Sequence, residues 1–131
     1  MTSTRLRWLA ATSAALTIFA AGFLLGANKY GKPASVVHVV TLKWKPESTP
    51  EQQRAALEGI ERMAGEIPGI RNVWLKTQKV QSPDQDFTNA FVIEFESQAA
   101  FARYADHPAH RAWEKIYLPI RARSYSHDIT N

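Results

Sequence analysis

The chain contains no cysteine, and this absence excludes several kinds of site. Without thiols there is no disulfide framework, no thiolate nucleophile and no zinc site with cysteine ligands. The six glycines are dispersed, so no glycine-rich phosphate loop is present, and no serine stands in the context of a hydrolase nucleophile. The four histidines and the scattered carboxylates lack metal-ligand spacing. We therefore expect a site that uses neither a metal nor a cofactor.

A basic face is missing as well, although the net charge is +4 and the isoelectric point is about 9.6. Four of the sixteen basic residues precede Pro33, where no acidic residue occurs, and the other twelve are matched by twelve acidic residues. A nucleic-acid-binding surface needs a basic run that neutralises phosphates, and the chain after Pro33 is formally neutral. The sequence therefore argues against nucleic acid as a partner.

One long uncharged run is present, and it lies near the N-terminus. Residues 8–28 carry no charge and are bounded by Arg7 and Lys29. A helix rises about 1.5 Å per residue, so this run is just long enough to cross a hydrocarbon core of about 30 Å. Trp8 and Tyr30 stand where amphipathic aromatic residues favour the two membrane interfaces. The run therefore predicts a membrane-spanning segment.

Two topologies fit this segment. As an uncleaved signal anchor, residues 1–30 would hold the chain at a membrane and place the following domain outside the cytoplasm, in the periplasm of a bacterium. Cleavage near the small residues Ala20-Ala21-Gly22 would instead release a secreted domain. The run continues past those small residues, which favours the anchor. Residues 31–35 then form a short linker to a domain over residues 36–131.

The pattern after the linker predicts strands and helices in the order β-α-β-β-α-β. Thr49 and Gln52 form a capping box around Pro50, and Pro68-Gly69 stops the helix that begins there. Pro108 breaks the second helical segment in two. The expected elements are strands over residues 36–45, 71–80, 87–96 and 124–130, and helices over residues 50–67, 98–105 and 108–120. The last helix is expected to bury a stripe made by Ala109, Ala112, Trp113, Ile116 and Ile120.

This order is that of a ferredoxin-like α+β fold, in which helices cover one face of an antiparallel sheet. The strands over residues 36–45 and 87–96 are nevertheless apolar on both faces. An exposed apolar face of that size indicates a partner. We therefore expect a homodimer in which two open sheet faces close into a dimeric α+β barrel.

Several short segments carry a family resemblance. They are residues 38–46 (HVVTLKWKP), 67–70 (IPGI), 91–95 (FVIEF) and, most specifically, 104–110 (YADHPAH) followed by Leu118-Pro119. Together they resemble the stress-responsive A/B barrel family, often called Dabb, over nearly the whole domain. The resemblance implies a ferredoxin-like dimer that forms an α+β barrel.

The resemblance also implies a candidate activity. A plant member of the family closes a linear polyketide thioester by aldol condensation, and a tyrosine and a histidine of its Tyr-x-x-His-Pro-x-His segment act on the substrate. These two residues correspond to Tyr104 and His110, and a strand-one histidine of that pocket corresponds to His38. A further histidine corresponds to Asn89, so the constellation of the cyclase is incomplete here.

Elementary chemistry supports Tyr104 and His110 as catalytic candidates in their own right. A neutral imidazole can take a proton from carbon beside a carbonyl, and a phenol can donate to the oxyanion that develops. The alternative is structural: Tyr104 fills the core with its hydroxyl bonded, and His110 bonds a helix-end backbone group. With Pro108 between them, the sequence does not show that the two side chains meet.

The remaining candidates leave similar alternatives open. His38 is either a satisfied core histidine on an apolar strand face or a pocket residue. Trp44 and Phe91 are either core or dimer-seam residues, or they line an apolar ligand cavity with His38 and Asn89. His107 is expected to be a turn residue.

Three classes of function follow. The first is a membrane-tethered module that binds a small apolar molecule, with a stress-related role. The second is a cofactor-free cyclase or isomerase that uses His110 and Tyr104. The third is a non-catalytic structural or interaction barrel. An enclosed pocket that reaches Tyr104, His110 and His38 favours the first two, and a filled interior favours the third.

Overall fold

A computed structural model describes residues 31–81 and 87–131 of the chain. By contacts the chain divides into two units, Met1–Lys32 and Pro33–Asn131, and everything below concerns the second. The predicted membrane segment over residues 8–28 lies outside the described residues. Within the described ranges, no helix is long and apolar enough to cross a membrane.

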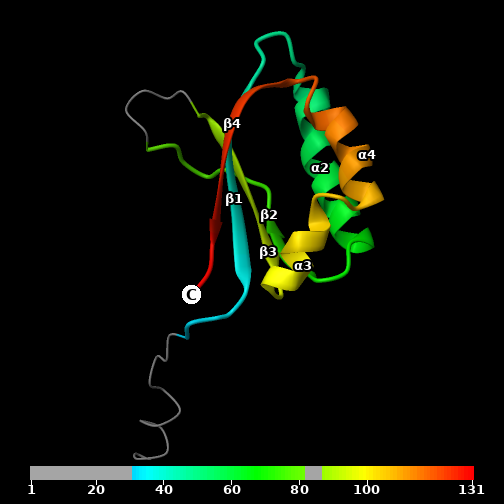
Figure 1. Ribbon diagram of the computed structural model, residues 1–131. Coiled ribbons are helices and arrows are strands. Elements are labelled where there is room, and N and C mark those ends of the chain that lie inside the picture. Colours follow the sequence, from blue (N-terminus) through cyan, green and yellow to red (C-terminus); the bar gives the residue numbers. More distant parts are fainter. Residues whose placement is uncertain (1–30, 82–86) are drawn as a thin grey trace, which may run out of the picture. The chain divides into compact units, whose positions relative to one another are not determined.

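The domain is built on one four-stranded antiparallel sheet (Figure 1). Its central strand β1 (Val36–Trp44) pairs with β3 (Asn89–Phe95) on one side and with β4 (Arg121–Ile129) on the other. The strand β2 (Ile70–Trp74) pairs with β3, which gives the order β2-β3-β1-β4. This is the ferredoxin-like arrangement that the sequence predicts.

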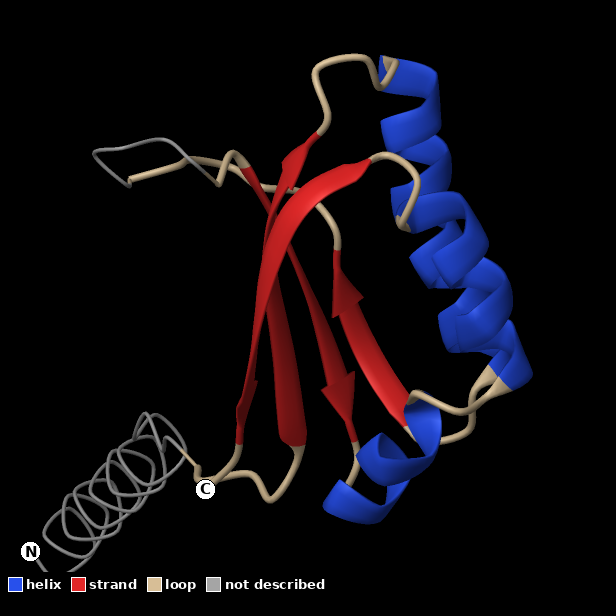
Figure 2. Ribbon diagram, turned by 45° about the horizontal axis from the view of Figure 1, so that its top comes forward, coloured by secondary structure: helices blue, strands red, loops and turns tan. Residues whose placement is uncertain are grey.

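Three helices lie on one face of this sheet (Figure 2). The helix α2 (Pro50–Glu66) begins with the predicted capping box, in which the Thr49 side chain accepts from the Gln52 backbone N–H and the Gln52 side chain accepts from the Thr49 N–H. The short helix α3 (Gln98–Tyr104) is capped by Ser97. The helix α4 (Pro108–Tyr117) follows after three residues and starts at a proline, as predicted.

The core lies between the sheet and the helices. Alternation along β1 places Val36, Val40, Leu42 and Trp44 against the helices, where all four are buried. No helix of the described residues lies over the opposite face of the sheet, where the large side chains Trp74, Tyr125 and Ile129 are each more than half exposed. The remaining core residues are Ala56, Ile60, Met63, Ile67, Phe91, Ile93, Phe95, Ala100, Tyr104, Ala109, Trp113, Tyr117 and Ile120.

One predicted strand is too long. The expected strand over residues 71–80 ends at Trp74 in the structure. Beyond that point the side chain of Thr77, rather than its backbone, bonds both the N–H and the carbonyl of Ala90 at 2.7 and 3.2 Å. A side-chain hydrogen bond of this kind replaces the backbone ladder locally, so regular pairing stops.

The buried stripe of the last helix also differs from the prediction. Ala112 is exposed and Ile116 is 42% exposed, whereas His110 and Tyr117 are buried with Trp113. Rings with a polar tip bury much more area than an alanine methyl, so α4 turns its aromatic side toward the sheet. Two of the polar groups on that side belong to the cavity described next.

Candidate functional site

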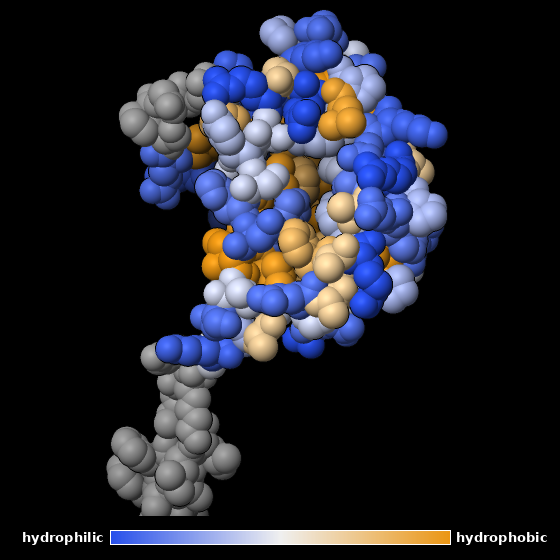
Figure 3. Space-filling model, in the orientation of Figure 1, coloured by the Kyte–Doolittle hydropathy of each residue, from blue (hydrophilic) through white to orange (hydrophobic). Residues whose placement is uncertain are grey.

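A cavity of about 270 Å³ lies between the sheet and the helices α3 and α4. Figure 3 shows hydrophobic side chains at the bottom of a hollow between β4 and the helices. The wall is largely apolar and aromatic, with a few polar groups set into it, which is the usual composition of a small-molecule site. The lining residues are His38, Val40, Phe91, Phe101, Tyr104, Ala105, His110, Trp113, Glu114, Tyr117, Leu118, Arg121, Ser124 and Ser126.

The two catalytic candidates meet on this wall. Tyr104 is the last residue of α3 and His110 lies in the first turn of α4, and their ring centroids are 4.3 Å apart. The break between the helices makes this contact possible, because His107 caps α4 through its Nδ1, which accepts from the Ala109 N–H at 3.2 Å. The predicted turn role of His107 is therefore extended to that of a helix cap.

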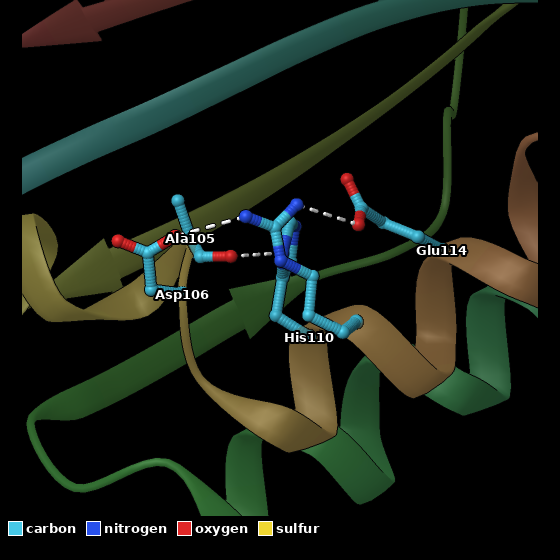
Figure 4. Close-up of polar contacts among 5 residues, drawn as sticks. Ala105, Asp106, His110 and Glu114 are labelled. Atoms are coloured by element: carbon cyan, nitrogen blue, oxygen red, sulfur yellow. Dashed lines mark hydrogen bonds and ion pairs between the residues drawn. The ribbon is translucent and has the colours of Figure 1, made fainter.

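The hydrogen bond of His110 determines which of its nitrogens is available. Its Nδ1 lies 3.0 Å from the carbonyl oxygen of Ala105, which can only accept, so Nδ1 carries the proton (Figure 4). In the neutral ring, Nε2 then carries a lone pair. Burial lowers the pKa of His110, with the Ala105 hydrogen bond opposing that shift in part. The side chain is therefore poised as a neutral base at pH 7.

Tyr104 has the complementary character. It is 4% exposed, and burial raises the pKa of its phenol. Its ring packs edge-on against Phe95, with centroids 5.0 Å apart, and stacks near Phe101. The phenol thus stays protonated throughout the neutral range and can act as a hydrogen-bond donor.

A third polar group on the wall is an imidazole–carboxylate pair. His38 Nδ1 on β1 lies 2.6 Å from Asp128 Oδ1 on β4, and the ring of His38 is 5.9 Å from that of Tyr104. The register of the two strands aligns His38 with Asp128. Sequence reasoning identified His38 but missed Asp128. The sequence alone does not show this contact, because it depends on the register in which β1 pairs with β4.

A fourth group lies at the end of α4 and the start of β4. The guanidinium carbon of Arg121 lies 5.5 Å from the ring centroid of Tyr117, and Arg121 Nη1 donates to Ser124 Oγ at 2.9 Å. Burial raises the pKa of Tyr117, and the nearby Ser124 hydroxyl and Arg121 guanidinium offset part of that rise. The Tyr117 hydroxyl nevertheless has no partner at hydrogen-bonding geometry among the described residues. Sequence reasoning named none of these three residues.

The four ligand-binding candidates do not all reach the cavity. His38 and Phe91 line it, whereas Trp44 and Asn89 line a separate open depression of about 380 Å³ beside α2. The structure therefore does not bring Trp44 and Asn89 together with His38 in one cavity. Trp44 does lie on the same face of β1 as His38, but six residues along a strand span about 20 Å. Asn89 is at that same end, because it begins β3 opposite Leu42.

Within residues 31–81 and 87–131, no cluster of three or more histidine, aspartate or glutamate side chains is placed to hold a metal ion. The polar groups of the cavity are instead spread along its wall, each with a different neighbour.

Comparison of the chain with known proteins identifies its family. The model of the family described as the stress responsive A/B barrel domain, Dabb, matches residues 36–131. The chain belongs to that family. It is 30% identical over 84 residues to a stress-response A/B barrel domain-containing protein of Arabidopsis thaliana, covering 63% of this chain and 77% of that protein. It is 27% identical over 84 residues to olivetolic acid cyclase of Cannabis sativa, covering 63% of this chain and 83% of the cyclase.

A solved structure shares the ferredoxin-like fold. A dimeric ferredoxin-like protein of unknown function from Thermobifida fusca superimposes with a TM-score of 0.63 at 21% identity, covering 79% of this chain and 97% of that one. At that identity the likeness shows the fold alone. It also shows that the fold occurs as a dimer in a structural neighbour.

Proposed function

We propose that this Dabb domain binds a small, largely apolar carbonyl compound in the cavity and moves a proton on it without a cofactor. The observation that carries the proposal is the contact between His110 and Tyr104. One is a neutral base and the other a protonated phenol, and both lie on the wall of one apolar cavity. Groups whose environments push them toward opposite acid–base roles in a shared pocket are typical of acid–base catalysis.

The chemistry that this pair supports is enolisation. The Nε2 of His110 takes a proton from the carbon beside the carbonyl, and the electron pair of the broken C–H bond forms the enolate. Tyr104 donates a hydrogen bond to the oxygen on which negative charge develops. The enolate is then either reprotonated, which gives isomerisation, or attacks a second carbonyl, which gives ring closure.

The relationship to olivetolic acid cyclase supports this class of reaction and not its particular substrate. Tyr104, His110 and His38 correspond to residues expected in such a cyclase, and all three line the cavity. Asn89 replaces the remaining histidine and lies at the other depression. A different substrate, or binding without turnover, is consistent with this departure.

Proton exchange tests the proposal without knowledge of the natural substrate. The full chain is incubated with 4-phenylbutan-2-one in D₂O, and proton NMR follows loss of the signals beside the carbonyl. We expect His110→Gln to slow the protein-dependent exchange roughly a hundredfold or more. His127→Gln, on the opposite face of the sheet, serves as the control and keeps the rate. Binding of the ketone without exchange would contradict catalysis and indicate that the domain only binds its ligand.

A homodimer through the open sheet face forms part of the proposal. The face carries exposed Trp74, Tyr125 and Ile129 together with half-buried Val39, and a dimeric neighbour shares the fold. Val39→Lys places a charge at the centre of this face and is expected to give a monomer in sedimentation velocity, because an unpaired buried charge is unfavourable. Ile116→Lys, on the exposed side of α4, is the matched control and should leave a dimer. A monomeric parent protein would contradict the proposal.

Membrane attachment through residues 8–28 forms the last part. Its support is the uncharged run in the sequence, with the Dabb domain then outside the cytoplasm. The full chain is expected to stay in the membrane fraction after an alkaline wash, and the domain to be degraded by protease added from outside. A mature protein that begins near Gly22 would indicate secretion after cleavage instead, and recovery of the intact chain from the cytosol would contradict both.

A further inference from the structure

Two buried donors on the cavity wall have no partner in the described residues. They are the hydroxyl of Tyr117, whose side chain is 4% exposed, and the Nε of Arg121. Buried polar groups are nearly always bonded, and one left without a partner destabilises the fold. Two such donors on neighbouring side chains of one cavity are therefore a feature that folding alone does not explain.

The surroundings of Arg121 show what these donors lack. Arg121 is oriented by Ser124 and lies over the Tyr117 ring, but no carboxylate of the described residues pairs with it. Glu114, an acidic residue of α4 that lines the same cavity, is paired with Arg111 at 3.2 Å. The Nε of Arg121 is buried although the residue as a whole is only half-buried, and a charged donor of this kind forms its strongest hydrogen bonds with an anion.

We propose that the ligand of the cavity is a carboxylic acid, whose carboxylate binds Arg121 and Tyr117. A planar carboxylate has two oxygens, which suits one donor from each residue and matches the planar geometry of a guanidinium. Both donor atoms are buried by the protein itself, so binding includes a rotation of the long Arg121 side chain. This inference rests on the proposed function, because it names the substrate class of the same cavity.

The spacing of the two polar parts of the cavity, His110 at one end and Tyr117 with Arg121 at the other, restricts the ligand further. The ring of Trp113 lies between them: its centroid is 5.6 Å from that of His110, and it stacks on the ring of Tyr117 with centroids 4.6 Å apart. A ligand that reaches both ends must therefore lie along Trp113, with several carbon atoms between its carboxylate and the carbon next to its carbonyl. The substrate class is an oxo acid with an apolar middle section.

A matched pair of probes tests the charge requirement. Calorimetric titration of the full chain compares 4-phenylbutanoate with 4-phenylbutanamide, which differ mainly in charge. We expect the parent protein to bind the acid roughly tenfold to a hundredfold more tightly, as hydrogen bonds to a charged group provide. Arg121→Gln should abolish this preference and leave binding of the amide unchanged. Tyr117→Phe, which removes one oxygen atom, should reduce the preference severalfold.

A second arginine supplies the control. Arg54→Gln changes the net charge equally, but Arg54 is an exposed residue of α2 that pairs with Glu51 and does not line the cavity, so the preference should persist. Equal affinity of the parent protein for acid and amide would overturn the inference while leaving the ligand cavity in place. An undiminished preference in Arg121→Gln would overturn it as well. If neither compound binds, both the inference and the proposed function fail.

Discussion

His38 and Asp128 lie 2.6 Å apart, Nδ1 to Oδ1, across two neighbouring strands although ninety positions separate them in the chain. An ionised carboxylate only accepts hydrogen bonds, so the pair directs the proton of His38 to Nδ1 and leaves Nε2 for other contacts. His38 is largely buried, with a side chain that is 14% exposed, and its ring is 5.9 Å from Tyr104. Asp128 thus acts as a positioning residue for a histidine on the cavity wall.

Asp128→Asn tests this positioning. An asparagine side chain can donate as well as accept, so the variant should admit both tautomers of His38. We expect nitrogen NMR to change from one His38 tautomer to a mixture of the two. A merely structural role would lower stability and leave the tautomer as it is. Unchanged nitrogen spectra would therefore contradict the assignment.

His110 should make stability depend on pH in a defined direction. Its pKa is lowered in the folded protein by burial, whereas the unfolded chain titrates near the ordinary histidine value of about 6.5. Between these two pKa values the unfolded chain binds more protons, so the free energy of unfolding rises with pH. The contribution is complete above about pH 6.5 and is lost as the pH falls through the lowered folded-state pKa.

Denaturant unfolding at a series of pH values measures this effect. His110→Gln should reduce the slope of stability against pH below about pH 6.5, because a glutamine at position 110 does not titrate. His127→Gln, which removes an exposed histidine, should retain the slope of the parent protein. Identical slopes in all three proteins would show that His110 is not held neutral by the fold.

Tyr104→Phe separates the phenol from the ring. The variant keeps the packing against Phe95 and His110, whose centroids lie 5.0 and 4.3 Å away, and loses only the hydroxyl. We expect proton exchange on 4-phenylbutan-2-one to fall roughly 10²–10³-fold, as on removal of one oxyanion donor, with ketone affinity little changed. Tyr125→Phe, on the open sheet face, is the control and should be neutral. A parallel loss of affinity would indicate a binding role instead.

Gly69 places α3, and with it Tyr104, against the sheet. Its φ is +92°, a conformation that other residues rarely adopt, and a methyl group there would lie 2.5 Å from Ala100 Cβ. Gly69→Ala should therefore lower the free energy of unfolding by about 1–3 kcal/mol in thermal or denaturant melts. Gly65→Ala, in α2 with open space around it, should stabilise by about 0.5–1 kcal/mol. Equal effects of the two substitutions would contradict this account.

The sheet and its helices follow directly from the local pattern. The capping box at Thr49, the prolines at the helix starts and the strand alternation are properties of neighbouring residues, and the structure confirms them. The errors lie where distant residues decide. Strand β2 stops early because Thr77 bonds Ala90, and α4 buries Tyr117 rather than Ile116 because of the sheet it faces.

The same distinction between local and long-range effects applies to the candidate site. The sequence by itself determined the order of elements, the break at Pro108 and the types of residue that a proton-transfer site requires, since these depend on short-range sterics and side-chain chemistry. Only the tertiary structure decided that Asp128 meets His38, that Arg121 joins the cavity, and that Trp44 and Asn89 lie elsewhere. Strand register and helix rotation make those choices, and both are set by packing between residues far apart in the chain.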